Sequence, residues 1–329
     1  MKILVIKLGA LGDVVIATPI IRRIQAHHRD ADLWVLTSPA YAELFAAWQG
    51  IHVKTIERHG LKNLVRAIAW IRSMRFDRIY DLQSNDRTSV IMALSGAKVR
   101  VGNHPRFPYT HHPGYTYRGE EHIFDRMNRV LESAGVPPAR PEPHIPVSDP
   151  SRKKVLAWLE SKGLLGKDYV VMHAGASRRW ETKRWPYYAE LAERLHGRGF
   201  NIVWVGGDDD VETNRVLASR TGVDATGRFT IPELVELGRH ARFAVTNDSG
   251  PMHALSASGI PVFAFFGPTD WKRSHAVGQG EHVMASTIDC SPCFKPVCPM
   301  EKGHACMRGI TPEAVMGRIE RYARMHRGS

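Results

Sequence analysis

The feature that most constrains this fold is a regular alternation of short, β-branched apolar runs with amphipathic stretches of helical period. In the first half of the chain we predict strands at residues 3–6, 33–36, 53–56, 78–81 and 99–101. We predict helices near residues 14–27, 40–48, 61–74, 88–94 and 123–133. Because alternating strands and helices build a parallel sheet covered by helices, this half should form one α/β domain.

A proline-rich connector follows this first half. Six prolines between residues 136 and 150 preclude a regular helix and favour a stiff linker. We therefore place the domain boundary near Asp149, so that the first domain spans residues 1–149. Ser151 is a suitable N-cap for a helix at residues 152–162.

The second half repeats the alternation and predicts a domain at residues 150–310. Its strands are expected at residues 169–173, 202–205, 243–246 and 262–266, and its helices at 186–197, 211–219, 231–239 and 251–258. Two such halves suggest a GT-B fold, in which two Rossmann-like domains with parallel sheets face each other across a cleft. The final segment, 311–329, predicts a helix with Thr311 as its N-cap, and we expect this helix to pack back across the first domain.

The composition restricts the location and the partners. No run of about 18 uncharged apolar residues predicts a spanning helix. Lys2, Lys7 and Asp13 interrupt the apolar start, which is unlike a signal peptide, so we expect a cytoplasmic protein. The net charge of +12 favours anionic partners such as nucleic acid, acidic lipids or phosphorylated substrates. It is spread along the chain and forms no nucleic-acid-binding arm, and many basic proteins have no polyanionic partner at all.

Three loops that follow predicted strands carry residues suited to chemistry. In doubly wound sheets ligands bind at this end of the strands. In residues 7–13, Gly12 allows a close approach of the backbone to a substrate, and Asp13 could accept a proton from a hydroxyl. In residues 173–186, backbone N–H groups and Lys183 could hold a diphosphate. In residues 246–253, Ser249 and Gly250 would start a helix as an anion site, with Asp248 and His253 directed to the same cleft.

Two further segments allow more than one interpretation. Residues 206–212 contain three consecutive aspartates, which could bind a metal, although we favour helix N-terminal charge with one sugar-contacting acid. Residues 102–121 are rich in histidine, tyrosine and arginine and predict a long ordered loop that is functional or a surface excursion.

The loop at residues 7–13 lacks the dinucleotide fingerprint, so nicotinamide binding is not indicated.

Taken together and in this order, four motifs resemble glycosyltransferase family 9, the ADP-heptose:lipopolysaccharide heptosyltransferases. These motifs are Gly12-Asp13, Lys183-Arg-Trp-Pro186, Asp248-Ser-Gly-Pro-Met-His253 and Gly267-Pro-Thr-Asp270. The resemblance spans nearly the whole chain. It implies a GT-B fold and the inverting transfer of L-glycero-D-manno-heptose from ADP-heptose to the lipopolysaccharide inner core.

The resemblance also implies roles for single residues. Asp13 matches the family's general base, Lys183 a residue that contacts the donor phosphates, and Asp248 with Ser249 and Gly250 the donor-binding turn. The family's acidic residue after Gly206-Gly207 falls at Asp210 or Glu212, and both remain open.

The chemistry of the transfer suggests further candidates. The leaving diphosphate can be stabilised by Lys183 and the helix start, so no catalytic metal or other cofactor is required. Arg106 and Arg118 are candidates, with Gly12, for binding the acceptor. Because the acceptor is anionic and embedded in a membrane, we expect peripheral association with the inner leaflet of the inner membrane.

The four cysteines of the chain lie close together, at Cys290, Cys293, Cys298 and Cys306. In a cytosolic protein a disulfide is disfavoured, and four thiolates could surround one tetrahedral ion such as zinc or iron. Such an ion would be structural, since four sulfur ligands leave no open position. Four reduced thiols or adventitious disulfides are the alternative.

Other functions remain open at this stage. A basic nucleic-acid-binding protein with a four-cysteine zinc module is one alternative, although we expect no nucleic acid. A nicotinamide oxidoreductase or a sugar-nucleotide epimerase on a Rossmann topology are others.

Overall fold

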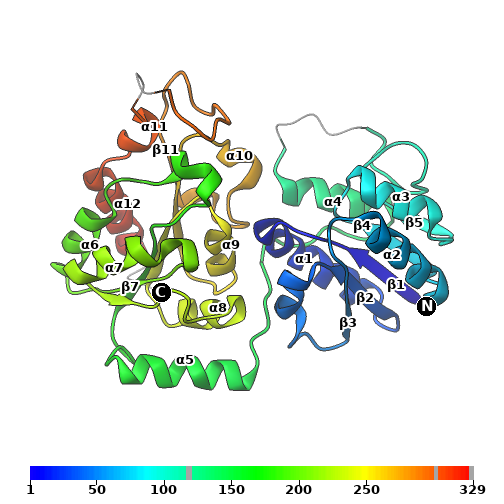
Figure 1. Ribbon diagram of the computed structural model, residues 1–329, viewed down its shortest axis with the longest axis horizontal. Helices are drawn as coiled ribbons and strands as arrows, with labels where there is room; N and C mark the ends of the chain where they lie inside the picture. The colour runs from blue at the N-terminus through cyan, green and yellow to red at the C-terminus, as the bar shows by residue number, and fades with distance from the viewer. Residues whose placement is uncertain (116–120, 300–302, 326–329) are drawn as a thin grey trace. The chain divides into compact units, whose positions relative to one another are not determined.

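The computed structural model describes residues 1–115, 121–299 and 303–325 of the chain. The chain divides into two compact units, residues Met1–Ser148 and Asp149–Ser329, so the division lies beside the predicted boundary at Asp149. Each unit contains one parallel sheet with helices around it (Figure 1). No helix in the described part of the chain is long and apolar enough to cross a membrane.

The first unit is built on a five-stranded parallel sheet with the order β3-β2-β1-β4-β5. The strands are β1 (Lys2–Ile6), β2 (Asp32–Thr37), β3 (Ile51–Thr55), β4 (Arg78–Asp81) and β5 (Val99–Val101). Residues 3–6 of β1 are fully buried, as expected for a central strand with helices on both faces. The winding reverses between β1 and β4, and such a switch point is where doubly wound sheets bind ligands.

The helices of the first unit are α1 (Leu11–His27), η1 (Pro39–Phe45), α2 (Leu61–Met74), α3 (Asp86–Leu94) and α4 (Ile123–Ser133). Helix α1 packs against α4 (Figure 1). The α-helix predicted at residues 40–48 is wrong, because this segment forms the 3₁₀-helix η1.

The second unit contains a six-stranded parallel sheet with the order β11-β10-β9-β6-β7-β8. The strands are β6 (Tyr169–His173), β7 (Asn201–Trp204), β8 (Val223–Asp224), β9 (Phe243–Asn247), β10 (Val262–Phe266) and β11 (Val283–Ala285). Alternate residues of β6 belong to two separate cores: Tyr169 and Val171 to one, Val170 and Met172 to the other. The winding reverses between β6 and β9, which places the ends of these two strands at the switch point.

Helices cover both faces of this second sheet. They are α5 (Asp149–Ser161), η2 (Arg178–Lys183), α6 (Tyr188–His196), η3 (Asp208–Asp210), α7 (Val211–Arg220), α8 (Ile231–Arg239), α9 (Gly250–Ser256), α10 (Trp271–Ser274), η4 (Gly280–His282), α11 (Ala305–Arg308) and α12 (Pro312–Met325). The prediction of Ser151 as an N-cap is wrong, because α5 begins at Asp149 and includes Ser151. A helix tolerates Pro150 in its first turn, where Asp149 adds a favourable negative charge.

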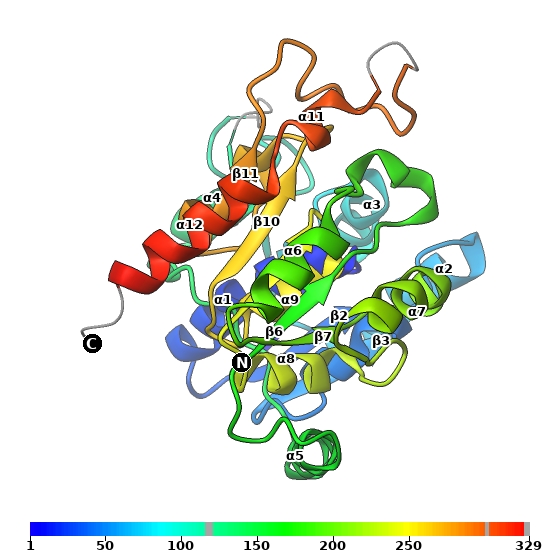
Figure 2. The same ribbon diagram turned by 90° about the vertical axis from the view of Figure 1, so that its left-hand side faces the viewer.

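Helix α12 belongs to the second unit, and its predicted packing across the first domain stays a prediction. Its apolar residues Val315 and Ile319 are buried in one core with Phe263 and Phe265 of β10. Figure 2 shows α12 (red) alongside β10 and β11. The predicted cap is present, because the Thr311 hydroxyl accepts the Ala314 N–H at 3.3 Å.

Candidate functional site

In the first unit, the loop after β1 holds a lysine–aspartate pair. The Lys7 ammonium lies 3.6 Å from a carboxylate oxygen of Asp13, the third residue of α1. The side chain of Lys7 is 3% exposed and that of Asp13 36%. Lys7 also donates a hydrogen bond to the Leu82 carbonyl at 3.3 Å. The pair therefore buries its cation and presents its carboxylate to solvent.

The environment of Lys7 is unusual for a lysine. Burial lowers the pKa of its ammonium, Asp13 raises it and Arg126 lowers it, and the balance is a lowered pKa. Desolvation thus outweighs the attraction of Asp13, because a buried charge loses its hydration. The sequence had marked Lys7 only as the start of a motif.

A buried carboxylate, that of Asp81 at the end of β4, supports the same loop. Asp81 accepts the Tyr109 hydroxyl at 2.6 Å and the backbone N–H of Gln83 at 3.0 Å. The Gln83 side chain in turn accepts the Leu8 N–H at 2.9 Å. Burial raises the pKa of Asp81, although the hydrogen bond from Tyr109 opposes the shift. Sequence reasoning missed Asp81 and Tyr109, although an aspartate that ends an apolar strand was a visible signal.

Gly9 and Gly12, between β1 and the first turn of α1, have different environments. Gly9 has φ +138°, and a Cβ there would lie 2.6 Å from a ring carbon of Tyr41, so only glycine fits. Gly12 lies in the first turn of α1. The role of Gly12 in acceptor binding stays a prediction.

The predicted loop at residues 102–121 is described except for residues 116–120. It is fastened to β5, because Thr110 donates its backbone N–H to the Arg100 carbonyl at 2.8 Å. Arg106 is exposed on this loop, and Arg118 lies outside the described residues. Both acceptor-binding roles therefore stay predictions.

In the second unit, three loops join at another lysine–aspartate pair. The Lys183 ammonium lies 2.6 Å from a carboxylate oxygen of Asp248. The Thr269 hydroxyl donates to the same oxygen at 2.6 Å. Lys183 ends η2, Asp248 follows β9 and Thr269 follows β10, so the structure brings together two residues that the sequence had predicted from separate motifs. Thr269 occurs in the last quoted motif but was not predicted as a site residue.

Asn247, at the end of β9, ties the neighbouring loop into place. Its amide donates to the carbonyls of Ala174 at 3.0 Å and Gly175 at 2.9 Å. Its side-chain oxygen accepts the Trp185 N–H at 3.1 Å. Sequence reasoning missed this residue, which fixes the segments on both sides of η2.

A histidine, His173, lies between two predicted site residues. One ring nitrogen of His173 is 3.5 Å from a carboxylate oxygen of Asp210, and the other is 3.2 Å from the Ser249 hydroxyl. Burial tends to raise the pKa of Asp210, but His173, the Gly207 N–H and Arg184 together hold it below its usual value. His173 opened the second motif but was not predicted as a site residue.

The two acidic candidates after Gly207 occupy different environments. Asp210 is buried beside His173, whereas Glu212 is exposed on α7 and pairs with Arg215 at 2.7 Å. A Cβ on Gly175 would overlap the carboxylate of Asp210. The small residue in that loop therefore makes room for Asp210.

The start of α9 contains the remaining donor-site candidates. Gly250 is the first residue of this helix and His253 is buried within it. Ser249 is the N-cap by position, but its side chain does not cap the helix and is directed to His173 and the Asn247 carbonyl instead.

The four cysteines carry free thiols beside the loop after β10. The Ser291 hydroxyl donates to the Gly267 carbonyl at 2.6 Å, and the Phe294 N–H donates to the Pro268 carbonyl at 2.7 Å. Burial raises the pKa of the Cys306 thiol, and the other three cysteines raise it further. Among the described residues, no three histidine, cysteine, aspartate or glutamate side chains form a group that could hold a metal ion. The structural metal ion stays a prediction, which elemental analysis of protein purified without added metal would test.

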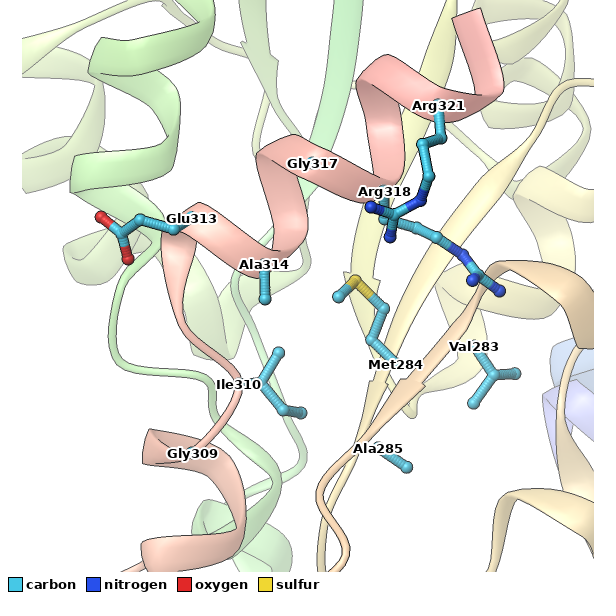
Figure 3. A pocket seen from close by; sticks show the side chains of 10 residues that line it. All are labelled: Val283, Met284, Ala285, Gly309, Ile310, Glu313, Ala314, Gly317, Arg318 and Arg321. Carbon is cyan, nitrogen blue, oxygen red and sulfur yellow. The ribbon is translucent and has the colours of Figure 1, made fainter. Parts of the chain in front are cut away.

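A cavity of about 460 Å³ lies elsewhere in the second unit (Figure 3). It is lined by β11, by residues 309 and 310 and by α12, with Arg318 and Arg321 at one end and Glu313 at the other. It contains none of the predicted site residues.

Relatives of the chain are heptosyltransferases. It is 27% identical over 172 residues to lipopolysaccharide heptosyltransferase 1 of Pseudomonas aeruginosa, a match that spans about half the length of either chain. It is 22% identical over 315 residues to lipooligosaccharide heptosyltransferase 2 of Campylobacter jejuni, which covers 93% of both chains.

Solved structures share the fold. The glycosyl transferase family 9 protein of Veillonella parvula superposes with a TM-score of 0.81 at 23% identity, over 97% of this chain and 96% of that one. The ADP-heptose lps heptosyltransferase II of E. coli superposes with a TM-score of 0.75 at 20% identity, over 97% and 98%. The chain therefore has the predicted GT-B fold, with two Rossmann-like domains.

The family model of glycosyltransferase family 9 (heptosyltransferase) matches residues 64–304, which is most of the chain. The match includes the motifs that contain Lys183 and Asp248. It supports an enzyme over the nucleic-acid-binding alternative. The chain therefore belongs to glycosyltransferase family 9, the heptosyltransferase family, and is a glycosyltransferase.

Proposed function

We propose that the protein transfers L-glycero-D-manno-heptose from ADP-heptose to a hydroxyl of the lipopolysaccharide inner core, with inversion at the anomeric carbon. The names of the matched relatives support the sugar and the acceptor class. The observation that carries the proposal is a Lys–Asp contact at the switch point of each sheet. In the first domain the carboxylate is the more exposed partner, and in the second domain the ammonium is.

The second domain binds the donor. Asp248 and Thr269 hold Lys183, whose ammonium can approach an anionic diphosphate. Negative charge grows on the diphosphate as the glycosidic bond breaks. A cation positioned in advance stabilises that charge, so the chemistry of transfer needs no divalent metal.

The first domain supplies the base. Asp13 accepts the proton of the acceptor hydroxyl as its oxygen attacks the anomeric carbon from the face opposite the diphosphate. The buried ammonium of Lys7 holds this carboxylate in place. The reaction requires Asp13 to meet the donor held by Lys183 and Asp248.

The first domain also binds the acceptor in this proposal. Arg106 and Arg118, with Gly12, are proposed to contact the phosphorylated core. The net charge of +12 suits an acceptor that is embedded in an anionic leaflet, so we propose peripheral association with the inner membrane. Sedimentation with vesicles with and without anionic lipid would measure that association.

A panel of nucleotide sugars tests the donor. ADP-heptose should raise the melting temperature more than ADP-glucose, UDP-glucose or UDP-N-acetylglucosamine, because a ligand that binds the folded state stabilises it by mass action. Only ADP-heptose should support transfer to lipopolysaccharide that lacks its heptoses. Efficient transfer from a different nucleotide sugar would replace this donor assignment and leave the family membership unchanged.

A further inference from the structure

The second domain contains a chain of contacts that the transfer reaction does not by itself require. It runs from Asp210, after β7, through His173 at the end of β6, to Ser249, after β9. All three strands are neighbours in the sheet, with β6 in the middle. His173 is 4% exposed, so its polar contacts are with protein groups at close range.

The two ring nitrogens of His173 face partners of different chemistry. Nε2 lies 3.5 Å from the carboxylate of Asp210, and a carboxylate only accepts hydrogen bonds. Nε2 is therefore best satisfied when it carries a hydrogen. Nδ1 lies 3.2 Å from the Ser249 hydroxyl, which can either donate or accept.

The direction of the bond to Ser249 then depends on the charge of the ring. A neutral His173 with its hydrogen on Nε2 has a bare Nδ1, which takes the hydrogen of the Ser249 hydroxyl. A cationic His173 has hydrogens on both nitrogens and donates from Nδ1 to the oxygen of Ser249. Protonation of His173 thus frees the hydroxyl hydrogen of Ser249, for which a bound anion would compete with the Asn247 carbonyl at 3.2 Å.

Asp210 is well placed to hold the cationic ring. Its carboxylate accepts the Gly207 N–H at 3.1 Å and lies against Gly175 and Gly206, where no other side chain fits. Arg184 is its other charged neighbour, with a nitrogen 3.8 Å from the second carboxylate oxygen. That oxygen accepts no hydrogen bond from the described residues.

We infer that binding of the donor diphosphate is coupled to protonation of His173, which turns the Ser249 hydroxyl into a donor toward the ligand. This inference rests on the proposed function, since the diphosphate belongs to the nucleotide-sugar donor. The anion gains one hydrogen bond from Ser249 and a positive charge behind it. His173 and Asp210 are positioning residues, because they act on the ligand through Ser249.

Calorimetry of ADP-heptose binding, without acceptor, measures this coupling directly. Titrations in buffers of different ionisation enthalpy give the number of protons taken up per bound ligand. Each phosphate of a nucleotide sugar carries one ester and one anhydride bond and lacks the second ionisation that a phosphate monoester has at about pH 6, so the ligand itself takes up no proton. We therefore expect proton uptake on binding and a Kd that rises with pH by up to about tenfold per pH unit.

Two variants identify the proton site. His173→Asn keeps a polar side chain that cannot change charge, and it should bind ADP-heptose with no proton uptake and little dependence on pH. Ser249→Ala should lose most of the uptake, although His173 is intact. His240→Asn is the matched control, because His240, directly after α8, likewise lies beside a buried carboxylate, that of Glu236 at 3.3 Å.

The outcomes separate the inference from the proposed function. Uptake in the wild type and in His240→Asn, but not in His173→Asn, supports the coupling. Binding of ADP-heptose with no proton uptake in the wild type overturns the coupling and leaves the donor assignment intact. Failure of ADP-heptose to bind at all overturns both.

Discussion

The two domains each contain a lysine–aspartate pair at the switch point of a parallel sheet, but the pairs are arranged in opposite ways. In the first domain the lysine, Lys7, is 3% exposed and the aspartate, Asp13, is 36% exposed. In the second domain Lys183 is 17% exposed and Asp248 9%. The distance from the lysine Nζ to the nearest carboxylate oxygen is 3.6 Å in the first pair and 2.6 Å in the second.

This difference shows how one kind of pair can serve two chemical tasks. The group that is buried positions its partner, and the group that is nearer to solvent meets the ligand. The first domain therefore presents a carboxylate, which suits a base, and the second presents an ammonium, which suits an anion. We expect the largest losses of transfer activity when the group that meets the ligand, Asp13 or Lys183, is changed. Changing a group that only positions it, such as Lys7, should have a smaller effect.

The largest expected effect is at Asp13. Asp13→Asn should lower transfer by about 10²- to 10⁴-fold, because the amide cannot accept the acceptor proton. The Kd for ADP-heptose should stay unchanged, since the donor binds the other domain. Asp86→Asn, another acid in the first turn of a helix, is the control. Full turnover by a folded Asp13→Asn enzyme would remove the base assignment.

Lys183→Met should lower kcat/KM by about 10²- to 10³-fold, because the leaving diphosphate loses a cation positioned in advance. ADP-heptose should also bind more weakly, in contrast to Asp13→Asn. Initial rates and calorimetry measure the two effects, with the exposed Lys295→Met as control. Unchanged donor affinity in Lys183→Met would contradict the role of this pair.

Lys7→Met should lower transfer by about tenfold to a hundredfold, because Asp13 is no longer held in place. Its effect on stability should depend on pH. The folded protein holds the pKa of Lys7 below 10.5, the value expected for the unfolded chain. At pH values between the folded and the unfolded pKa, the unfolded chain binds more protons, so wild-type stability rises with pH. This contribution is at most about 1.4 kcal/mol per pH unit.

Urea unfolding at several pH values between about 7 and 10 measures that slope. Lys7→Met should lose it, whereas the exposed Lys62→Met should keep the wild-type slope. Identical slopes in wild type and Lys7→Met would show that burial of Lys7 does not depress its pKa.

The smallest expected effect is at Glu212. Glu212→Gln should change the Kd for ADP-heptose by less than about twofold, because an exposed ion pair contributes little. Asp210→Asn should weaken binding clearly, because it removes the carboxylate beside His173. The reverse order of effects would show that Glu212, and not Asp210, is the family's acidic residue in this chain.

Most of the sheet strands, and the location of Lys183 and Asp248 at one edge of the sheet, could be predicted from local patterns. Strands such as residues 3–6 are short apolar runs, which can be recognised from adjacent residues alone. Lys183 and Asp248 each follow a strand, and parallel strands bring their carboxyl ends to one edge. The short strands β8 and β11 were missed because so few residues show no clear pattern, although the three-residue β5 was predicted.

The contacts among distant residues could not be predicted. His173 and Ser249 are 76 positions apart, and Tyr109 and Asp81 are 28 apart. No local pattern relates such residues, because a hydrogen bond between side chains depends on the angle at which each loop leaves its strand. The same holds for Thr269, whose hydroxyl reaches Asp248 from the next loop.

The sequence alone determined which residues follow each strand, and thereby which chemical groups each sheet edge can offer. Only the tertiary structure distinguished the environments of Asp210 and Glu212, which are two positions apart and equally acidic. The turn η3 directs Asp210 inward, where the glycines at 175 and 206 leave room for its carboxylate, whereas α7 directs Glu212 toward Arg215 and solvent. The physical reason is that packing space, which three separate loops create together, is not encoded in any one of them.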